Sequence, residues 1–190
     1  MKRLMITALI VLTSFSLSFS QEARKKGFVL GFGGGLGLTS FTQEVDIWGI
    51  TIKGDRENKI GFQTDFKIGY APTPQLQIYW TAKSSWFGLE NALGDNVIIL
   101  NGFGGAGISY YLKQQSPSFF LSGGLGYSSW GTPFEEGTEG SYGLGLFLGG
   151  GYEFSKHFCI EGNLKWGNPS EDILSTNAFT FLASAQLKLK

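Results

Sequence analysis

The sequence is poor in the residues that carry most catalytic and metal chemistry. Its 190 residues include one cysteine and one histidine, so it forms no internal disulfide and lacks the ligand set of a common zinc site. Charged residues make up 16% of the chain and the formal net charge is zero. The longest basic run is Arg24-Lys25-Lys26, which is too small a basic footprint for nucleic acid to be an expected partner. We expect no cofactor and no bound metal.

The chain also lacks an apolar run long enough for a membrane-spanning helix. The one candidate extends from Leu4 to about Leu17 and is interrupted by polar residues, whereas a helix needs ~20 apolar residues to cross a bilayer. It follows a Met-Lys-Arg start and precedes the small residues Ser18 and Ser20, which is the pattern of a secretory signal peptide. The predicted organisation is therefore a cleaved signal peptide over 1–20, a short periplasmic segment over 21–26 and one domain over 27–190.

Glycine and aromatic residues are abundant, with 29 Gly, 17 Phe, 7 Tyr and 5 Trp. The 42% of hydrophobic residues is too high for a disordered chain. From residue 27 onwards, apolar positions alternate with polar or small ones with a period of two, the pattern of β-strands. Alternating runs occur at about 27–39, 59–70, 75–86, 98–112, 118–128, 142–154, 158–166 and 179–190. These runs predict about eight strands, each long enough for the ~9–11 residues of a tilted strand that spans a bilayer.

Three features favour a membrane barrel over a soluble sandwich or barrel. Short turns near 71–74, 114–117 and 155–156 alternate with longer segments at about 42–58, 89–96, 131–141 and 167–177, as in outer-membrane barrels. Aromatic residues on the apolar face collect towards both strand ends, where two membrane interfaces would lie. Many glycines occupy the polar face, which lets about eight strands close around a narrow interior. The predicted fold class is an all-β, eight-stranded antiparallel up-and-down transmembrane β-barrel.

In these respects the chain resembles the small eight-stranded outer-membrane barrels of the OmpA/OmpX type, within the porin-like barrel proteins. The resemblance covers Gly27 to Lys190 and is one of architecture rather than of a specific motif. It implies that the protein lies in the outer membrane of a Gram-negative bacterium with both termini in the periplasm. It also implies contact with outer-membrane lipid and lipopolysaccharide, and insertion by the barrel insertion machinery.

Charged residues at inward-facing positions are the first set of candidate functional residues. Buried charges are costly unless they are paired, so we expect a network of salt bridges that closes the lumen. Its expected members are Asp65, Lys67, Lys83, Glu153, Glu161, Lys165 and Lys188. Glu161 with Lys188 is the expected central pair, because the two lie on neighbouring strands at similar depth. A proton or ion path lined by the same groups is the functional alternative.

The outer loops supply the second set of candidates. Apolar and acidic residues on an exposed loop can contact a partner, and the expected contacts are Trp48, Ile50, Phe134, Glu135 and Glu136. A purely structural interpretation is also open for the first loop, in which 45–52 extend a hairpin above the membrane with Trp48 packed on it. Most acidic residues fall in these loops, so the outer rim is expected to be acidic and to favour cationic partners.

No motif indicates catalysis. Residues 102–107 match G-x-G-x-x-G, but a strand-like run follows them rather than the helix that a dinucleotide site requires. His157 is expected at a periplasmic turn without a nucleophilic serine nearby, and Cys159 is expected to pack inside the barrel. We therefore expect a non-enzymatic outer-membrane protein with a structural or surface-interaction role in envelope integrity, adhesion or defence. The alternative is a narrow channel or a binder for small hydrophobic or ionic solutes.

Overall fold

The structure is a computed structural model, and it describes residues 22–48, 50–90, 94, 96–135, 140–171 and 174–189. The predicted signal peptide over 1–20 and the predicted contact Glu136 lie outside these residues. Among the described residues, none belongs to a helix long and apolar enough to cross a membrane.

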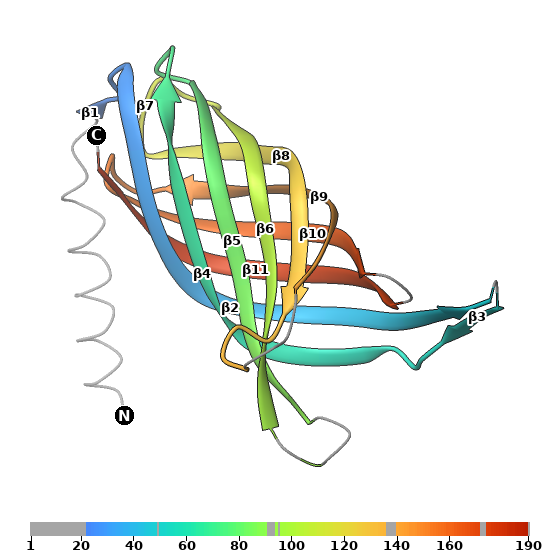
Figure 1. The fold of residues 1–190 in the computed structure, drawn as a ribbon. Coiled ribbons are helices and arrows are strands. Elements are labelled where there is room, and N and C mark those ends of the chain that lie inside the picture. The colour runs from blue at the N-terminus through green and yellow to red at the C-terminus, as the bar shows by residue number, and fades with distance from the viewer. Residues whose placement is uncertain are drawn as a thin grey trace, which may run out of the picture.

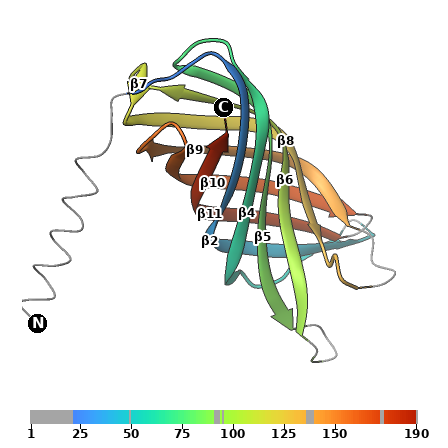
Figure 2. The same cartoon turned by 90° about the vertical axis from the view of Figure 1, so that its left-hand side faces the viewer.

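Eight long strands form a closed antiparallel ring, which confirms the predicted fold class (Figures 1 and 2). Each strand pairs with its neighbour in the sequence, and the last strand pairs with the first to close the barrel. The ring strands are β2 (Gly27–Ile47), β4 (Glu57–Ala71), β5 (Leu76–Glu90), β6 (Asn96–Tyr111), β8 (Ser118–Gly131), β9 (Ser141–Glu153), β10 (Phe158–Glu171) and β11 (Leu174–Leu189). The short β3 (Ile50–Lys53) extends the first hairpin, while β1 (Glu22–Ala23) pairs with β7 (Gln115–Ser116).

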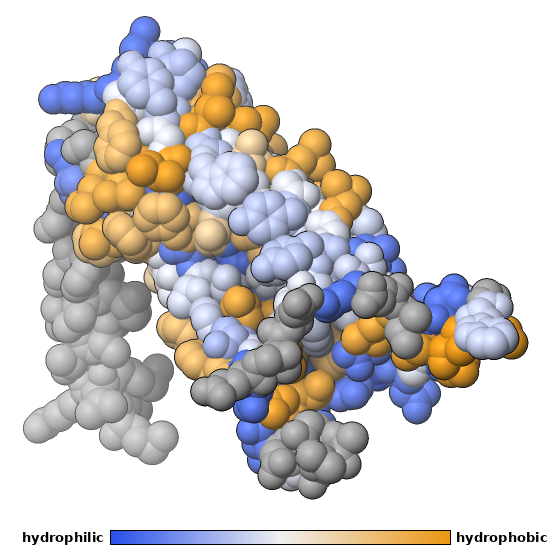
Figure 3. All heavy atoms as spheres, viewed as in Figure 1, coloured by the Kyte–Doolittle hydropathy of each residue, from blue (hydrophilic) through white to orange (hydrophobic). Residues whose placement is uncertain are grey.

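The two sides of the barrel wall differ as the alternation predicts. Outward positions carry large apolar side chains that remain exposed, such as Leu36, Leu125 and Leu148. The aromatic residues expected near the strand ends also face outward, among them Phe28, Phe62, Tyr70, Phe119, Tyr142, Phe158 and Phe179. Figure 3 shows hydrophobic and weakly polar residues over much of the wall in view, with hydrophilic residues gathered mainly towards the two ends. Exposed apolar surface of this extent requires an apolar solvent or a partner.

Inward positions carry polar or charged residues, glycines and some buried aromatic residues such as Tyr79, Phe103 and Phe147. At several of these glycines a side chain would meet the neighbouring strand, as at Gly35, where an added Cβ would overlap the carbonyl of Ala183. The glycines therefore let the strands approach closely, which is the geometric reason expected for their abundance.

The barrel has one end with short connections and one with longer projections. β1, β7 and the end of β11 lie together at the short end (Figure 1). At the other end two predicted loops are mostly strand. The segment predicted as a loop over 167–177 continues the ladder instead, with Ser170 opposite Ser175 and Glu171 opposite Leu174. The segment over 42–58 is likewise a hairpin, in which β2 pairs with β3 and β4. The loop predicted over 167–177 was wrong, because alternation weakens beyond the apolar belt. The hairpin over 45–52, which the structural interpretation of the first loop predicted, is confirmed.

Candidate functional site: the lumen and the outer hairpin

The lumen is filled by side chains in layers, beginning at the end with short turns. There Lys188 on β11 places its Nζ 3.0 Å from Glu153 Oε2 on β9 and donates to the hydroxyl of Tyr111. Arg24, which precedes β2, reaches into the same layer and lies 3.4 Å from Glu153 Oε1. Its Nη2 donates to the main-chain oxygens of Lys113 and Gln115, and its guanidinium stacks 4.0 Å from the Tyr111 ring centroid. Burial lowers the pKa of Arg24, and the charge of Glu153 opposes that shift.

The next layer is a cluster of charges centred on Glu161. Lys67 Nζ lies 3.1 Å from Glu161 Oε2, and Lys83 Nζ lies 3.6 Å from Oε1. Lys83 also pairs with Asp65 at 2.5 Å. Gln186 donates its amide to both acids, at 2.6 Å to Glu161 and 2.8 Å to Asp65. All these side chains are buried, so the paired charges and amide form one polar cluster across the barrel.

The expected central pair is not the one that forms. Glu161 contacts Lys67 and Lys83, whereas Lys188 contacts Glu153. Glu161 and Lys188 lie at different heights in the lumen, because the register places Ser184 rather than Lys188 opposite Glu161. Asp65 and Lys83, by contrast, are opposite each other on adjacent strands and do pair. Register within a strand pair therefore matters as much as which strands are neighbours.

Lys165 also departs from the expected pattern. Its Nζ donates to the main-chain oxygen of Asn101 at 2.6 Å and to Asn101 Oδ1 at 2.9 Å. Among the described residues no carboxylate pairs with it. The Asn101 amide in turn donates to Thr180, whose hydroxyl lies 3.1 Å from that of Thr39. Hydrogen bonds from Lys165 to neutral acceptors thus take the place of a salt bridge in this third layer.

An apolar cap closes the lumen at the end with longer projections. It consists of Phe41, Phe87, Ile99, Trp130 and Ala178, with Leu89 and Val97 packed against them. Phe41 and Trp130 are both buried, and their ring centroids are 4.8 Å apart. Aromatic residues at inward positions near strand ends are the sequence signal that could have identified this cap.

In the part of the chain that the structure describes, the polar groups of the lumen form ion pairs and hydrogen bonds with one another. Among the described residues, no group of histidine, cysteine and acidic side chains could hold a metal ion. Cys159 is buried beside Gln186 at 3.7 Å. His157 lies at the β9–β10 turn, where its Nδ1 is 2.9 Å from the main-chain oxygen of Lys188.

The outer hairpin formed by the end of β2 and β3 has two unlike faces. Val45, Ile47, Ile50 and Ile52 lie on one face, because the register pairs Val45 with Ile52 and Ile47 with Ile50. The three isoleucines are strongly exposed. On the opposite face Glu44 and Lys53 form a salt bridge of 2.8 Å. The hairpin is therefore an amphipathic ribbon that projects beyond the barrel (Figure 1).

Trp48 occupies the tip of this hairpin. The structural interpretation predicted that Trp48 packs on the hairpin, but its side chain is 99% exposed, so that prediction was wrong. Its φ of 56° lies in the left-handed region, which costs a residue other than glycine about 1–2 kcal/mol. The position thus holds a large apolar side chain that is exposed and conformationally costly.

The remaining predicted contacts lie on the β8–β9 connection. Phe134 is 69% exposed, and its ring centroid lies 6.2 Å from that of Trp86 on the barrel wall. Glu135 is exposed, and its amide donates to the main-chain oxygen of Thr132. Phe134 and Glu135 lie on a different projection from Trp48 and Ile50, so the predicted contacts do not form a single cluster.

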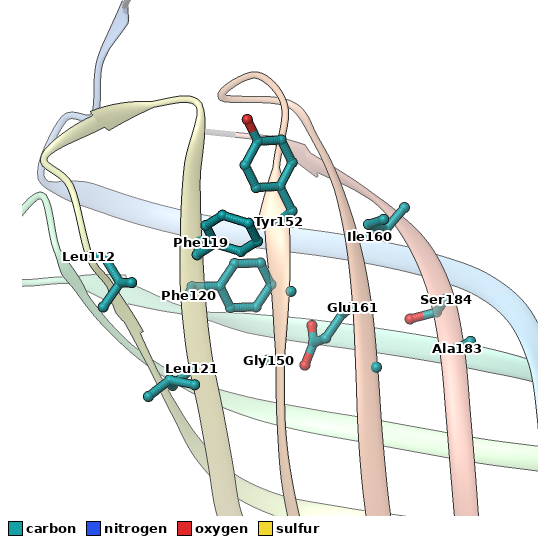
Figure 4. A pocket seen from close by; sticks show the side chains of 12 residues that line it. Leu112, Phe119, Phe120, Leu121, Gly150, Tyr152, Ile160, Glu161, Ala183 and Ser184 are labelled. Atoms are coloured by element: carbon teal, nitrogen blue, oxygen red, sulfur yellow. The ribbon is translucent and has the colours of Figure 1, made fainter.

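A hollow of about 710 Å³ lies on the outer wall across β8–β11 (Figure 4). Its floor is formed by Gly150, Gly162 and Ala183, which adjoin in register and present little side chain. The rings of Phe119 and Tyr152 border it, with centroids 4.7 Å apart. The hollow faces the same side as the apolar belt, and it offers a polar ligand no cluster of donors.

Comparisons with known proteins agree with this architecture. No protein-family model matches the sequence, and no curated protein matches it. Among solved structures, Neisserial surface protein A is 14% identical with a TM-score of 0.54, over 86% of this chain and 96% of that one. The outer membrane protein OprG from Pseudomonas aeruginosa is 14% identical with a TM-score of 0.51, over 90% of this chain and 99% of that one. The chain therefore has the fold of the small outer-membrane barrels, as the sequence resemblance implied.

Proposed function

We propose that the protein spans the outer membrane of a Gram-negative bacterium and serves as a non-enzymatic surface-interaction protein. The exposed apolar belt supports the membrane placement, because lipid is the solvent that such a belt requires. The belt would contact outer-membrane lipid and lipopolysaccharide. With the termini in the periplasm, the outer hairpin extends away from the cell.

The observation that carries the interaction role is the apolar face of the outer hairpin. Trp48 and the three isoleucines expose a contiguous apolar set on a projecting ribbon. Natural sequences use left-handed tryptophan sparingly, because the backbone cost must be offset by some other gain. Contact of this face with an extracellular partner would supply that gain by burying the tryptophan.

The layered lumen supports this role over conduction. The salt bridges, the Lys165 layer and the apolar cap lie in series along the barrel. An eight-stranded interior is narrow enough for its own side chains to fill it. We therefore place the function on the outer surface rather than along the axis.

A cell-adhesion assay tests the proposal. Cells that display the wild-type protein are compared with Trp48→Ser and Ile50→Thr variants for adhesion to epithelial cells and to extracellular matrix. We expect both variants to lose most of the adhesion while barrel folding, measured by heat-modifiable electrophoretic mobility, is unchanged. Lys53→Gln on the polar face of the same hairpin is the matched control and should retain adhesion. Wild-type adhesion by the Trp48→Ser variant would contradict the proposed contact.

A further inference from the structure

A cavity of about 220 Å³ lies at the periplasmic rim of the barrel, remote from the outer hairpin. Residues 23–28 form one wall, and Lys156 and His157 from the β9–β10 turn form the other. The cavity is thus built from two segments that are far apart in the sequence and that the barrel closure brings together.

The lining of this cavity is strongly basic. Arg24, Lys25, Lys26 and Lys156 all contribute to it, and none of the lining residues that the structure describes is acidic. Glu153, the acid beside Arg24, accepts from Lys188 and Ser116 inside the lumen. Lysine side chains gathered at one small cavity are an arrangement that can recognise a phosphate group.

Both walls are held in place by the fold. The amide of Arg24 donates to the main-chain oxygen of Gln114, and the adjoining β1 pairs with β7. The amide of Lys188 donates to the main-chain oxygen of His157, and the ring of His157 contacts the main chain of Lys188. The site is therefore largely preformed, which lowers the entropic cost of binding a ligand.

Arg24 closes the inner side of this cavity. Its side chain is 1% exposed and lies beside Glu153 inside the lumen, where its Nη2 donates to the main-chain oxygens of Lys113 and Gln115. Because this guanidinium is already paired, an anion in the cavity would be held by Lys25, Lys26 and Lys156 at the rim.

The position of the cavity indicates that the anion is part of a lipid. Phe28 lines the cavity, and its ring is 57% exposed on the outer, lipid-facing side of β2. A lipid at this rim would place its phosphate against the basic residues and its glycerol and acyl chains against Phe28. Basic pockets at the headgroup level of a membrane bind anionic lipids through this combination.

We propose that this cavity is a binding site for the phosphate of an anionic phospholipid headgroup in the inner leaflet of the outer membrane. The proposal rests on the proposed membrane placement, since the site must lie at the periplasmic interface. Such a site would fix the height of the barrel in the membrane through an interaction specific to its periplasmic end. Free phosphate in the periplasm offers the same chemistry and is the competing source.

Native mass spectrometry of the folded barrel in detergent tests the proposal, with phosphatidylglycerol and phosphatidylcholine as the probes. The wild-type protein should retain phosphatidylglycerol in preference to phosphatidylcholine. The Lys25→Gln/Lys26→Gln/Lys156→Gln variant should bind phosphatidylglycerol at least about tenfold more weakly, because each lysine near an anionic lipid contributes roughly a factor of five. Lys53→Gln/Arg56→Gln/Lys59→Gln removes the same charge from the outer hairpin and should bind as the wild type does.

Each outcome has a defined meaning. Equal binding of phosphatidylglycerol by the wild type and the periplasmic variant would overturn the site. An equal loss of phosphatidylglycerol binding by the outer-hairpin control would show that net charge alone causes the loss, which would also overturn the site. Displacement of the lipid by millimolar inorganic phosphate would assign the site to free phosphate, whereas retention would support the lipid. Flotation of the wild type with vesicles is measured separately, so a failure there would refute the membrane placement itself.

Discussion

Replacing Glu161 with glutamine tests whether the charge cluster stabilises the barrel. Glutamine has nearly the same shape as glutamate, so Glu161→Gln removes a charge with little change in packing. Lys67 Nζ at 3.1 Å and Lys83 Nζ at 3.6 Å would each lose their contact with this carboxylate. Lys83 retains Asp65, but Lys67 is left without its paired acid in a buried setting.

The expected magnitude follows from the balance of charge in the lumen. Among the described residues, five basic and three acidic side chains are buried, so the interior already carries excess positive charge. Removing one acid increases that excess and leaves a buried ammonium uncompensated, which costs about 3–5 kcal/mol. The substitution also changes the contact with Gln186, whose side-chain amide donates to the Glu161 carboxylate at 2.6 Å in the wild-type protein. We expect Glu161→Gln to lower the free energy of unfolding by about 3–5 kcal/mol.

Urea unfolding in lipid vesicles, followed by tryptophan fluorescence and heat-modifiable mobility, measures this change. Glu57→Gln is the control, because Glu57 pairs with Lys59 at 3.3 Å while 48% exposed, and an exposed pair contributes about 0–1 kcal/mol. Removing Lys67 together with Glu161 should restore part of the lost stability, since coupled residues interact by about 0.5–3 kcal/mol. A loss below about 1 kcal/mol for Glu161→Gln would refute the inference that pairing stabilises the lumen.

Three further predictions concern the barrel wall and its two ends. Trp130→Ala should lower the free energy of unfolding by about 3–5 kcal/mol because it empties part of the apolar cap. Trp48→Ala should change the free energy of unfolding by less than about 0.5 kcal/mol, so similar urea midpoints for the two variants would contradict this assignment. Gly35→Ala should destabilise the barrel by about 1–3 kcal/mol because its Cβ would overlap the adjacent strand, while Gly88→Ala, whose Cβ meets nothing within 4 Å, should be tolerated. Arg24→Ala should leave planar bilayers without steady conductance, because the cap at the other end still closes the lumen; discrete channel steps would argue for a conducting path.

Sequence reasoning was most reliable where a single local period carries the information. Alternation at Phe62, Phe66 and Tyr70 predicted which side chains face outward, because a strand can place successive residues only on opposite sides. The same parity predicted that Lys83 and Glu161 lie inside. It was less reliable at the outer rim, where Ser170 and Ser175 continue a ladder without any apolar belt to mark it.

The fold class, the number of ring strands and the inward or outward direction of the strand side chains follow from alternation within each strand. The sequence alone was therefore sufficient to predict them. Which charges meet depended on barrel closure. Glu161 on β10 pairs with Lys67 on β4, across the barrel. Arg24 reaches Glu153 from the segment that precedes β2. The exposure of Trp48 and the burial of Trp130 were decided in the same way, since both tryptophans lie near strand ends in similar sequence surroundings. Strand stagger and ring closure set these distances, and they arise from the hydrogen-bonded register of all eight strands together.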